Sequence, residues 1–324
     1  MTSGKIRRAL QLAGENPPSL KYLALQTAWS IAPAPPRPLT FSWSLPADVL
    51  SETFIRWPTP VPPTDARWWE DKFRLAFGAH VPIQRAAIPQ PFWSILIFDV
   101  LFSGRQYRVA IDYRDDSEIS TDCADVVSTY FKLQFSSEGY PFDHVLPGGY
   151  VVKQQKFYRY LPHIRALKEK RPLFDVYGRF SPRSELRNEI VSRLKSQNLF
   201  KFEGGLGIAL YVQSLWEEAR ASITLDLPGY GSFCYRLPEY LGIGSCVIAL
   251  PHQNRLPIPL VDREHIAFTK PNGDDLLDLC EYYLEHHTER ENLMKNSRDY
   301  FDRYLDYRQL GAYYLSALIE RLAR

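Results

Sequence analysis

The chain has 324 residues, of which 45% are hydrophobic and 23% charged, a composition typical of a globular protein with a large core. Its 39 lysines and arginines against 37 aspartates and glutamates leave a net charge of +2, which gives no electrostatic reason to expect DNA, RNA or an acidic membrane as partner. The four cysteines lack the close pairs of a zinc site and the density of a secreted scaffold. We therefore expect buried thiols in a reducing compartment and no metal site.

The N-terminal segment begins with basic residues, and two prolines at 17 and 18 interrupt it before a signal-peptide core can form. No stretch approaches the roughly 20 apolar residues of a spanning helix. We therefore expect a cytoplasmic protein. Residues 20–31 carry an apolar face, which predicts packing on their own domain or, alternatively, peripheral contact with a membrane surface.

Residues 32–91 are crowded with proline and tryptophan. Proline at this density argues against long helices and central strands, and the tryptophans supply large apolar surfaces that need covering. We expect this region to wrap in an extended form around a small domain. A polyproline II ligand for a partner's aromatic groove is the alternative.

The apolar runs 92–98 and 107–113 are the predicted strands of the N-terminal half. The second run ends in an acidic cluster that includes Asp112 and Asp115, and Asp122 follows a few residues later. Carboxylates just past the end of a buried strand lie where open α/β sheets place their sites. A solvated turn accounts for the cluster equally well.

From residue 172 onward, predicted strands alternate with predicted helices, and a parallel sheet with right-handed crossovers follows from that order. The expected elements are a strand at 173–177, a helix at 183–196, a strand at 200–202, a glycine turn at 203–207, a helix at 208–219 and a strand at 264–268. Three more helices are expected: one from residue 272, then 293–305 and 310–322, the last two with aromatic residues at the spacing of a buried face.

Residues 222–250, SITLDLPGYGSFCYRLPEYLGIGSCVIAL, are predicted to form a strand, a glycine turn, a short helix and a second strand. Ser232 is the expected N-cap of that helix, which should run to about Gly242. Backbone N–H groups at such a turn suit an anion such as a phosphate, and Arg236 would add a charged fork at the same place.

Familiar catalytic signatures are missing from the chain. The sequence contains no Walker lysine motif, no GxSxG, no HExxH and no GxGxxG. The adjacent pair His286-His287 points to different sides of a helix, which argues against a metal site there. The remaining combination is recognition of a phosphoanhydride by the glycine turn and Arg236, with acid/base chemistry from a carboxylate across a cleft.

From Asp175 to the C-terminus, the chain resembles the nucleotide-sugar-binding half of GT-B glycosyltransferases. Its order is most similar to the capsule-associated protein and protein O-glucosyltransferase group, glycosyltransferase family 90. The residues that carry the resemblance are LDLPGYGS (225–232), RLPEYL (236–241), GSCVI (244–248), Pro259, EHI (264–266), the DDLLDLCEYYLEHHTER helix and the closing YFDRYLDYRQLGAYYL helices.

The resemblance implies a donor site in which Arg236 neutralises the leaving diphosphate and Glu239 grips the donor ribose. Relatives with a paired-glutamate motif carry another glutamate eight residues earlier, where this chain has Gly231, which argues against the retaining mechanism linked to that pair. An intrahelical pair of Arg236 with Glu239 is the bland alternative. Arg187 is a further phosphate candidate or part of a solvated helix face. The implied donor-binding residues are Gly229, Gly231, Ser232, Tyr235, Arg236, Glu239, His265 and Arg179.

For an inverting transfer, an N-terminal carboxylate would deprotonate the acceptor hydroxyl. Asp112 is the first candidate for that catalytic base, followed by Asp115 and Asp122.

The resemblance further implies an α/β protein of GT-B type, with two Rossmann-like domains facing a cleft, a short and irregular N-terminal one, and C-terminal helices that cross back. The expected ranges are 1–165 for the acceptor-side domain, 166–305 for the nucleotide-sugar-binding domain and 306–324 for a bracing helix.

The implied activity is transfer of a sugar from a nucleotide sugar, expected to be a UDP-sugar, to a hydroxyl on a glycan, a protein or another acceptor. No metal and no cofactor beyond the donor is expected. A DNA-base-modifying glycosyltransferase and a non-catalytic nucleotide-binding scaffold are the alternatives.

Overall fold

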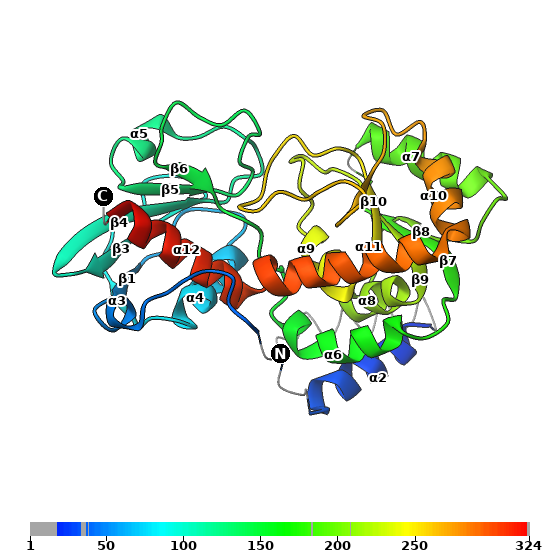
Figure 1. Ribbon diagram of the computed structural model, residues 1–324, viewed down its shortest axis with the longest axis horizontal. Coiled ribbons are helices and arrows are strands. Elements are labelled where there is room, and N and C mark those ends of the chain that lie inside the picture. The colour runs from blue at the N-terminus through cyan, green and yellow to red at the C-terminus, as the bar shows by residue number, and fades with distance from the viewer. Residues whose placement is uncertain (1–17, 34–36, 38, 183, 208, 323–324) are drawn as a thin grey trace.

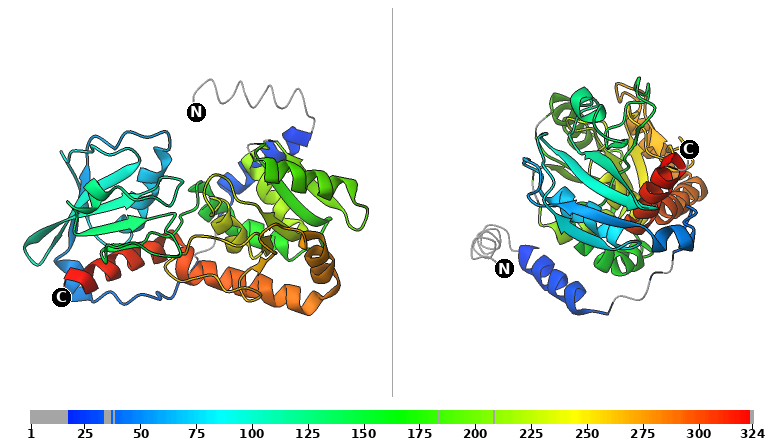
Figure 2. Two further views of the ribbon diagram at one scale, coloured as in Figure 1. Left: turned by 90° about the horizontal axis from the view of Figure 1, so that it is seen from above. Right: turned by 90° about the vertical axis from the view of Figure 1, so that its left-hand side faces the viewer.

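The computed structural model describes residues 18–33, 37, 39–182, 184–207 and 209–322, which form two α/β domains side by side (Figure 1). Each domain has its own sheet, and the C-terminal helices run beneath both domains (Figure 2). This architecture confirms the predicted fold class of two α/β domains.

The N-terminal sheet has six strands in the order β2-β1-β3-β4-β5-β6. β3 and β4 form an antiparallel hairpin, whereas β1–β2, β4–β5 and β5–β6 are parallel pairs. This mixture of directions matches the irregular domain expected. The strands are β1 (Phe54–Pro58), β2 (Ile83–Ala86), β3 (Ile95–Phe102), β4 (Arg105–Asp112), β5 (Thr129–Lys132) and β6 (Val145–Pro147), and the helices are α3 (Ala47–Ser51), α4 (Trp68–Gly78) and α5 (Thr121–Ala124).

The proline- and tryptophan-rich region is more regular than predicted. β1 lies between β2 and β3, and α4 is an 11-residue helix, so the expectation of extended wrapping is wrong for these segments. The prolines cluster between the elements, and 54–57 and 68–78 contain none. Trp57 is fully buried and stacks on Phe98 with ring centroids 5.3 Å apart, so its apolar surface is covered by the core of the N-terminal domain.

The second sheet is wholly parallel, with the order β11-β10-β9-β7-β8, as the strand-helix alternation predicted. Its strands are β7 (Phe174–Phe180), β8 (Phe202–Leu206), β9 (Ala221–Asp226), β10 (Cys246–Ala249) and β11 (Ala267–Phe268). The helices after these strands are α7 (Glu185–Ser196), α8 (Tyr211–Ala219), α9 (Leu237–Ile243), α10 (Leu276–Glu285) and α11 (His287–Tyr300).

The predicted glycine turn at 203–207 is wrong, because residues 202–206 form β8. Gly204 has a φ of 115° and lies against the backbone of Gly178 on β7, where a Cβ would overlap the Gly178 carbonyl. Glycine serves here for the close approach of two strands.

Two helices that precede the second sheet in the sequence pack on the second domain. α2 (Pro18–Ile31) and α6 (Lys156–Lys168) pack together on α8, so the apolar face of α2 is covered by the second domain. In α2, Tyr22 lies edge-on to Trp216 with ring centroids 5.7 Å apart. The expected domain boundary at 165/166 falls inside α6. Among the described residues, no helix has the length and apolar character needed to cross a membrane.

The last helix crosses back to the N-terminal domain, as predicted. A π-helical turn, η1 (Phe301–Leu305), joins α11 to α12 (Tyr307–Leu322), and α12 packs on α4 (Figure 1). Gly311 permits this close packing, because a Cβ there would overlap the carbonyl of Ala76. Tyr313 donates a hydrogen bond of 2.7 Å to the carbonyl of Pro147, which ties the helix to the end of β6.

Candidate active site

The two domains meet in a seam of backbone hydrogen bonds between the segment after β5 and the loop after β10. The Arg255 N–H donates to the carbonyl of Phe135 over 2.9 Å, and the Ser137 N–H donates to the carbonyl of Gln253 over 3.0 Å. Ser136 and Asn254 form an antiparallel bridge between these bonds. Because both segments follow parallel strands, the carboxyl ends of the two sheets face the same junction, which is where α/β proteins place their sites.

The glycine-rich loop, residues 227–236, leaves the end of β9 and runs along this seam. The helix after it starts at Leu237 rather than near Ser232, and Pro238 in its first turn suits that start. The Ser232 hydroxyl instead accepts a hydrogen bond of 2.8 Å from the Gln253 N–H. The predicted N-cap role of Ser232 is therefore wrong, and the loop is longer than expected.

Two guanidinium groups beside this loop have no carboxylate partner in the part of the chain that the structure describes. The guanidinium carbons of Arg187 and Arg236 each lie 5.8 Å from the ring centroid of Phe180, at the end of β7. Arg187 is only 5% exposed and donates one hydrogen bond of 2.7 Å to the Leu227 carbonyl. The Nε atoms of both arginines are buried without a hydrogen-bond partner.

No carboxylate of the described residues forms an ion pair with Arg187 or Arg236, so the intrahelical Arg236–Glu239 pair, the alternative to a functional role, is not formed. Arg187 is buried and Arg236 partly buried; cations removed from water without counter-charges are costly, and an anionic ligand would satisfy them. Arg187 is thus buried beside the loop rather than part of a solvated face.

A third cation comes from the link between the domains. The ammonium group of Lys153, between β6 and α6, lies 4.4 Å from the ring centroid of Tyr235 and 5.1 Å from that of Trp68. Desolvation by the surrounding protein lowers the pKa of Lys153, and the charge of Glu239 opposes this effect. Because Lys153 belongs to no recognisable motif, sequence reasoning missed it.

Glu239 lies buried in the first turn of α9, with 3% of its surface exposed. Burial raises its pKa to about 7, and a hydrogen bond of 2.8 Å from the Tyr211 hydroxyl acts in the opposite direction. A second buried carboxyl, Glu218, accepts a 3.0 Å hydrogen bond from the Ser245 hydroxyl, and burial together with the charge of Glu239 raises its pKa.

The first candidate base, Asp112, is fully buried and already occupied. Arg114 Nη2 lies 2.7 Å and Lys132 Nζ 3.2 Å from its carboxylate oxygens, and the Tyr130 hydroxyl donates to it over 2.5 Å. A carboxylate saturated by two cations and a hydroxyl has no free lone pair directed at a substrate. Asp112 therefore holds the N-terminal domain together.

Asp115 is the candidate base that the structure brings to the glycine-rich loop. Its Oδ1 accepts a hydrogen bond of 2.6 Å from Gln134 Nε2, and the Gly231 backbone also donates to its carboxylate. The protein around the carboxyl group partly removes it from water, and this desolvation raises the pKa of Asp115. Asp115 and Asp122 are both exposed, but Asp122 lies in the first turn of α5, at the top of the N-terminal domain in Figure 1, away from the glycine-rich loop.

Two residues of the predicted donor set have other partners. Arg179 Nη2 lies 2.8 Å from Glu217 and 3.8 Å from Glu203, so its charge is already neutralised. The Nδ1 of His265 accepts a hydrogen bond from the Val261 N–H in a local turn, and its ring packs on Tyr300 with centroids 4.8 Å apart. The structure does not join these two residues to the glycine-rich loop.

The structure adds His252 to the loop's surroundings. Its ring lies 4.7 Å from that of Phe233, and its Nε2 lies 3.9 Å from an Asp226 carboxylate oxygen. Among the described residues, no group of three or more His, Cys, Asp or Glu is arranged to hold a metal ion.

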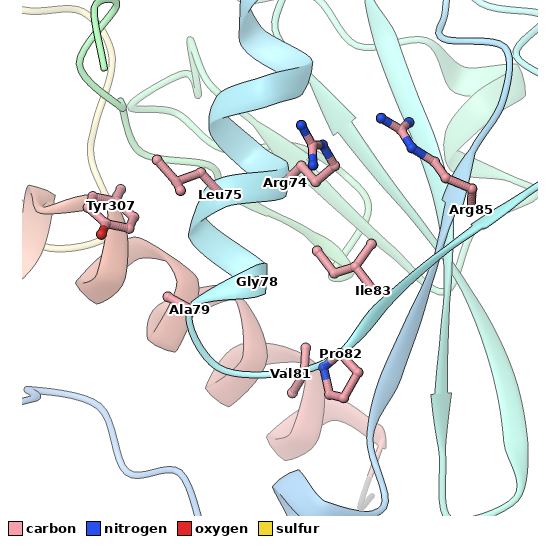
Figure 3. A pocket seen from close by; sticks show the side chains of 9 residues that line it. All are labelled: Arg74, Leu75, Gly78, Ala79, Val81, Pro82, Ile83, Arg85 and Tyr307. Carbon is pink, nitrogen blue, oxygen red and sulfur yellow. The ribbon is translucent and has the colours of Figure 1, made fainter. Parts of the chain in front are cut away.

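A surface cavity of about 480 Å³ lies apart from the glycine-rich loop, between the second half of α4, β2 and the start of α12 (Figure 3). Arg74 and Arg85 line it, but Arg74 pairs with Asp71 at 3.0 Å and Arg85 pairs with Glu70 at 3.1 Å. A second cavity of about 460 Å³ lies between α6 and α11. Neither includes a residue of the glycine-rich loop, whose space beside Gly231 is filled by Gln134 and Asp115.

One family model and one solved structure show a similarity to parts of this chain. Residues 162–316 match the model of a family described as Glycosyl transferase-like, a range that covers the parallel sheet, the glycine-rich loop and most of α12. This match covers slightly less than half of the chain, and it shows that the second domain is similar to glycosyltransferase-like proteins. A search of curated proteins gave no match. Among solved structures, the chain is similar to a glycosyltransferase from Rickettsia africae ESF-5, with 10% identity and a TM-score of 0.43 over 63% of this chain and 68% of that chain.

Proposed function

We propose that the protein transfers a sugar from a UDP-sugar to a hydroxyl of a glycan or protein, with inversion at the anomeric carbon and without an obligatory metal. The kinship with glycosyltransferase family 90 and a cytoplasmic location are part of this proposal. The observation that carries it is the pair of uncompensated guanidinium groups, Arg187 and Arg236, beside the glycine-rich loop, with Asp115 facing that loop across the domain seam.

In this proposal the donor diphosphate binds at the glycine-rich loop. Arg187 and Arg236 would neutralise it, and Lys153 would add a third positive charge from the N-terminal side. Glu239 would accept hydrogen bonds from the ribose hydroxyls. The buried position of Glu239 excludes water, so that these hydrogen bonds would be strong.

Asp115 would act as the general base. It would remove the proton of the acceptor hydroxyl while that oxygen forms a bond to the anomeric carbon, and the bond from that carbon to the diphosphate oxygen would break. The nucleoside diphosphate leaves with the electron pair, and Arg236 neutralises the charge that develops. The raised pKa of Asp115 makes it a stronger base than a fully solvated aspartate.

Donor binding is tested by the rise in melting temperature with UDP, UDP-glucose, UDP-galactose and UDP-N-acetylglucosamine. A ligand at 100 times its Kd stabilises the fold by about 2.7 kcal/mol. We expect the shift to be lost in Arg236→Ala and kept in Arg303→Ala, which removes an exposed arginine from η1. An absence of any shift with the wild-type chain would overturn the proposed donor.

The base is tested by nucleotide release from the donor that gives the largest shift. Asp115→Asn should reduce turnover by about 10²- to 10⁴-fold, the usual contribution of a general base, while the donor-induced thermal shift persists. Asp122→Asn is the matched control and should retain the wild-type rate. Equal rates for Asp115→Asn and wild type would remove Asp115 from the mechanism.

A further inference from the structure

We infer that Gln134 is a positioning residue: its side-chain amide holds Asp115 and the glycine-rich loop in one hydrogen-bonded unit across the domain seam. The inference rests on the proposed role of Asp115 as the base. It adds a residue that lies in the N-terminal domain, outside the range that matches the glycosyltransferase-like family model.

Gln134 follows β5 and is completely buried. Its Nε2 donates to Asp115 Oδ1 over 2.6 Å and to the Phe233 carbonyl over 3.2 Å, and its Oε1 accepts from the Phe233 N–H over 3.2 Å. The reverse orientation of the amide would place its oxygen against a carboxylate and a carbonyl, so the partners fix which end is nitrogen. The Gln134 side chain thus forms hydrogen bonds both with the Phe233 backbone of the loop and with Asp115, the proposed base.

Gly231 completes this unit from the side of the loop. A Cβ at this position would overlap both Gln134 Nε2 and Asp115 Oδ1, so the loop backbone lies directly against the two side chains. Only a residue without a side chain allows this approach. The base and the loop that would hold the donor therefore meet directly at the Gln134 side chain.

The hydrogen bond from Gln134 favours the charged form of Asp115, because it donates to the carboxylate. It lowers the pKa of Asp115, against the larger effect of burial, which raises it. The Gly231 N–H and the charge of Lys132 act in the same direction as Gln134, and the charge of Asp116 acts in the opposite direction. Loss of the Gln134 amide should therefore raise the pKa of the base and move the acid limb of the pH–rate profile to higher pH.

The experiment compares Gln134→Leu with Asn254→Ala in the full-length chain. Gln134→Leu introduces an apolar side chain of similar size and removes all three hydrogen bonds. Asn254→Ala removes the 2.6 Å hydrogen bond from Asn254 Nδ2 to the Gln134 backbone carbonyl, in the same seam, and leaves the Gln134 amide in place. Nucleotide release from the UDP-sugar identified by thermal shift is measured between pH 5 and 9.

We expect Gln134→Leu to lower kcat at least tenfold, with the KM for the donor changed less, and to move the acid limb upward by half a pH unit or more. Asn254→Ala should leave the acid limb in place. In an Asp115→Asn background, Gln134→Leu should add less than a threefold further loss, because both changes act through the same base. A loss of kcat with an unmoved acid limb, or full additivity, would overturn the positioning role while leaving Asp115 as the base.

Hydrogen exchange supplies a readout that needs no turnover. Phe233 donates its N–H to Gln134 Oε1, so Gln134→Leu should speed exchange in the peptide that contains residues 228–236, and Asn254→Ala should not. Unchanged exchange in Gln134→Leu would overturn the inference that Gln134 holds the loop. If exchange becomes faster but Asp115→Asn retains activity, the proposed function fails and Gln134 is only a structural link between the domains.

Discussion

Replacement of Glu239 by glutamine should stabilise the protein near neutral pH and have little effect at acidic pH. Burial raises the pKa of Glu239 from an ordinary value of 4.5 to about 7. A carboxyl whose pKa is raised by folding favours the native state in its protonated form. That contribution is fully present below pH 4.5 and is lost as the pH rises through about 7.

The magnitude follows from the interval between these two pKa values. At about 1.4 kcal/mol for each pH unit, the interval from 4.5 to about 7 corresponds to about 3 kcal/mol of lost stability in the wild type. The glutamine of the variant would carry no charge, and its amide oxygen can still accept the hydrogen bond from Tyr211. The pKa of about 7 already includes the attraction of the Glu239 charge to Arg236 and Lys153, so these two groups need no separate allowance.

The measurement is urea unfolding of both proteins at pH 4.5, 5.5, 6.5 and 7.5. We expect the two free energies of unfolding to agree within about 1 kcal/mol at pH 4.5, and Glu239→Gln to be more stable by about 3 kcal/mol at pH 7.5. The same variant should show a smaller donor-induced thermal shift. A stability difference that is constant across this pH range would refute the argument from burial.

Two further predictions concern the N-terminal carboxylates. Asp112→Asn should lower the free energy of unfolding by about 3 kcal/mol, because Arg114 and the buried Lys132 lose their shared partner. The turnover of the folded fraction should stay close to that of the wild type. A large loss of turnover at full stability would restore Asp112 as the base. Gly231→Ala should lower the free energy of unfolding by about 1–3 kcal/mol and reduce turnover as strongly as Gln134→Leu, because the new methyl group displaces Gln134 and Asp115. Wild-type turnover in this variant, measured by nucleotide release, would show that the contact at Gly231 is dispensable.

Local sequence pattern accounts well for the second domain. The strands β7, β9 and β10 and the helices between them follow from apolar periodicity, and their alternation implies a parallel sheet. The same reasoning failed at two positions. Glycine occurs both in turns and where two strands approach closely, and Gly204 serves the second purpose. The start of α9 depends on Pro238 rather than on Ser232.

The sequence by itself determined the class of fold and the position of the glycine-rich loop after β9, and it singled out Arg236 and Glu239 as candidates, because all of these depend on residues close together in the chain. Only the tertiary structure shows how the environments of the candidate acidic residues differ. The parallel register of β4 and β5 places Asp112 opposite Lys132, which neutralises it, whereas Asp115 passes the strand end and meets Gly231 of the other domain. Lys153 and Gln134 reach the loop from parts of the chain that are distant in sequence, and no local pattern records a contact that exists only after the two domains have folded against each other.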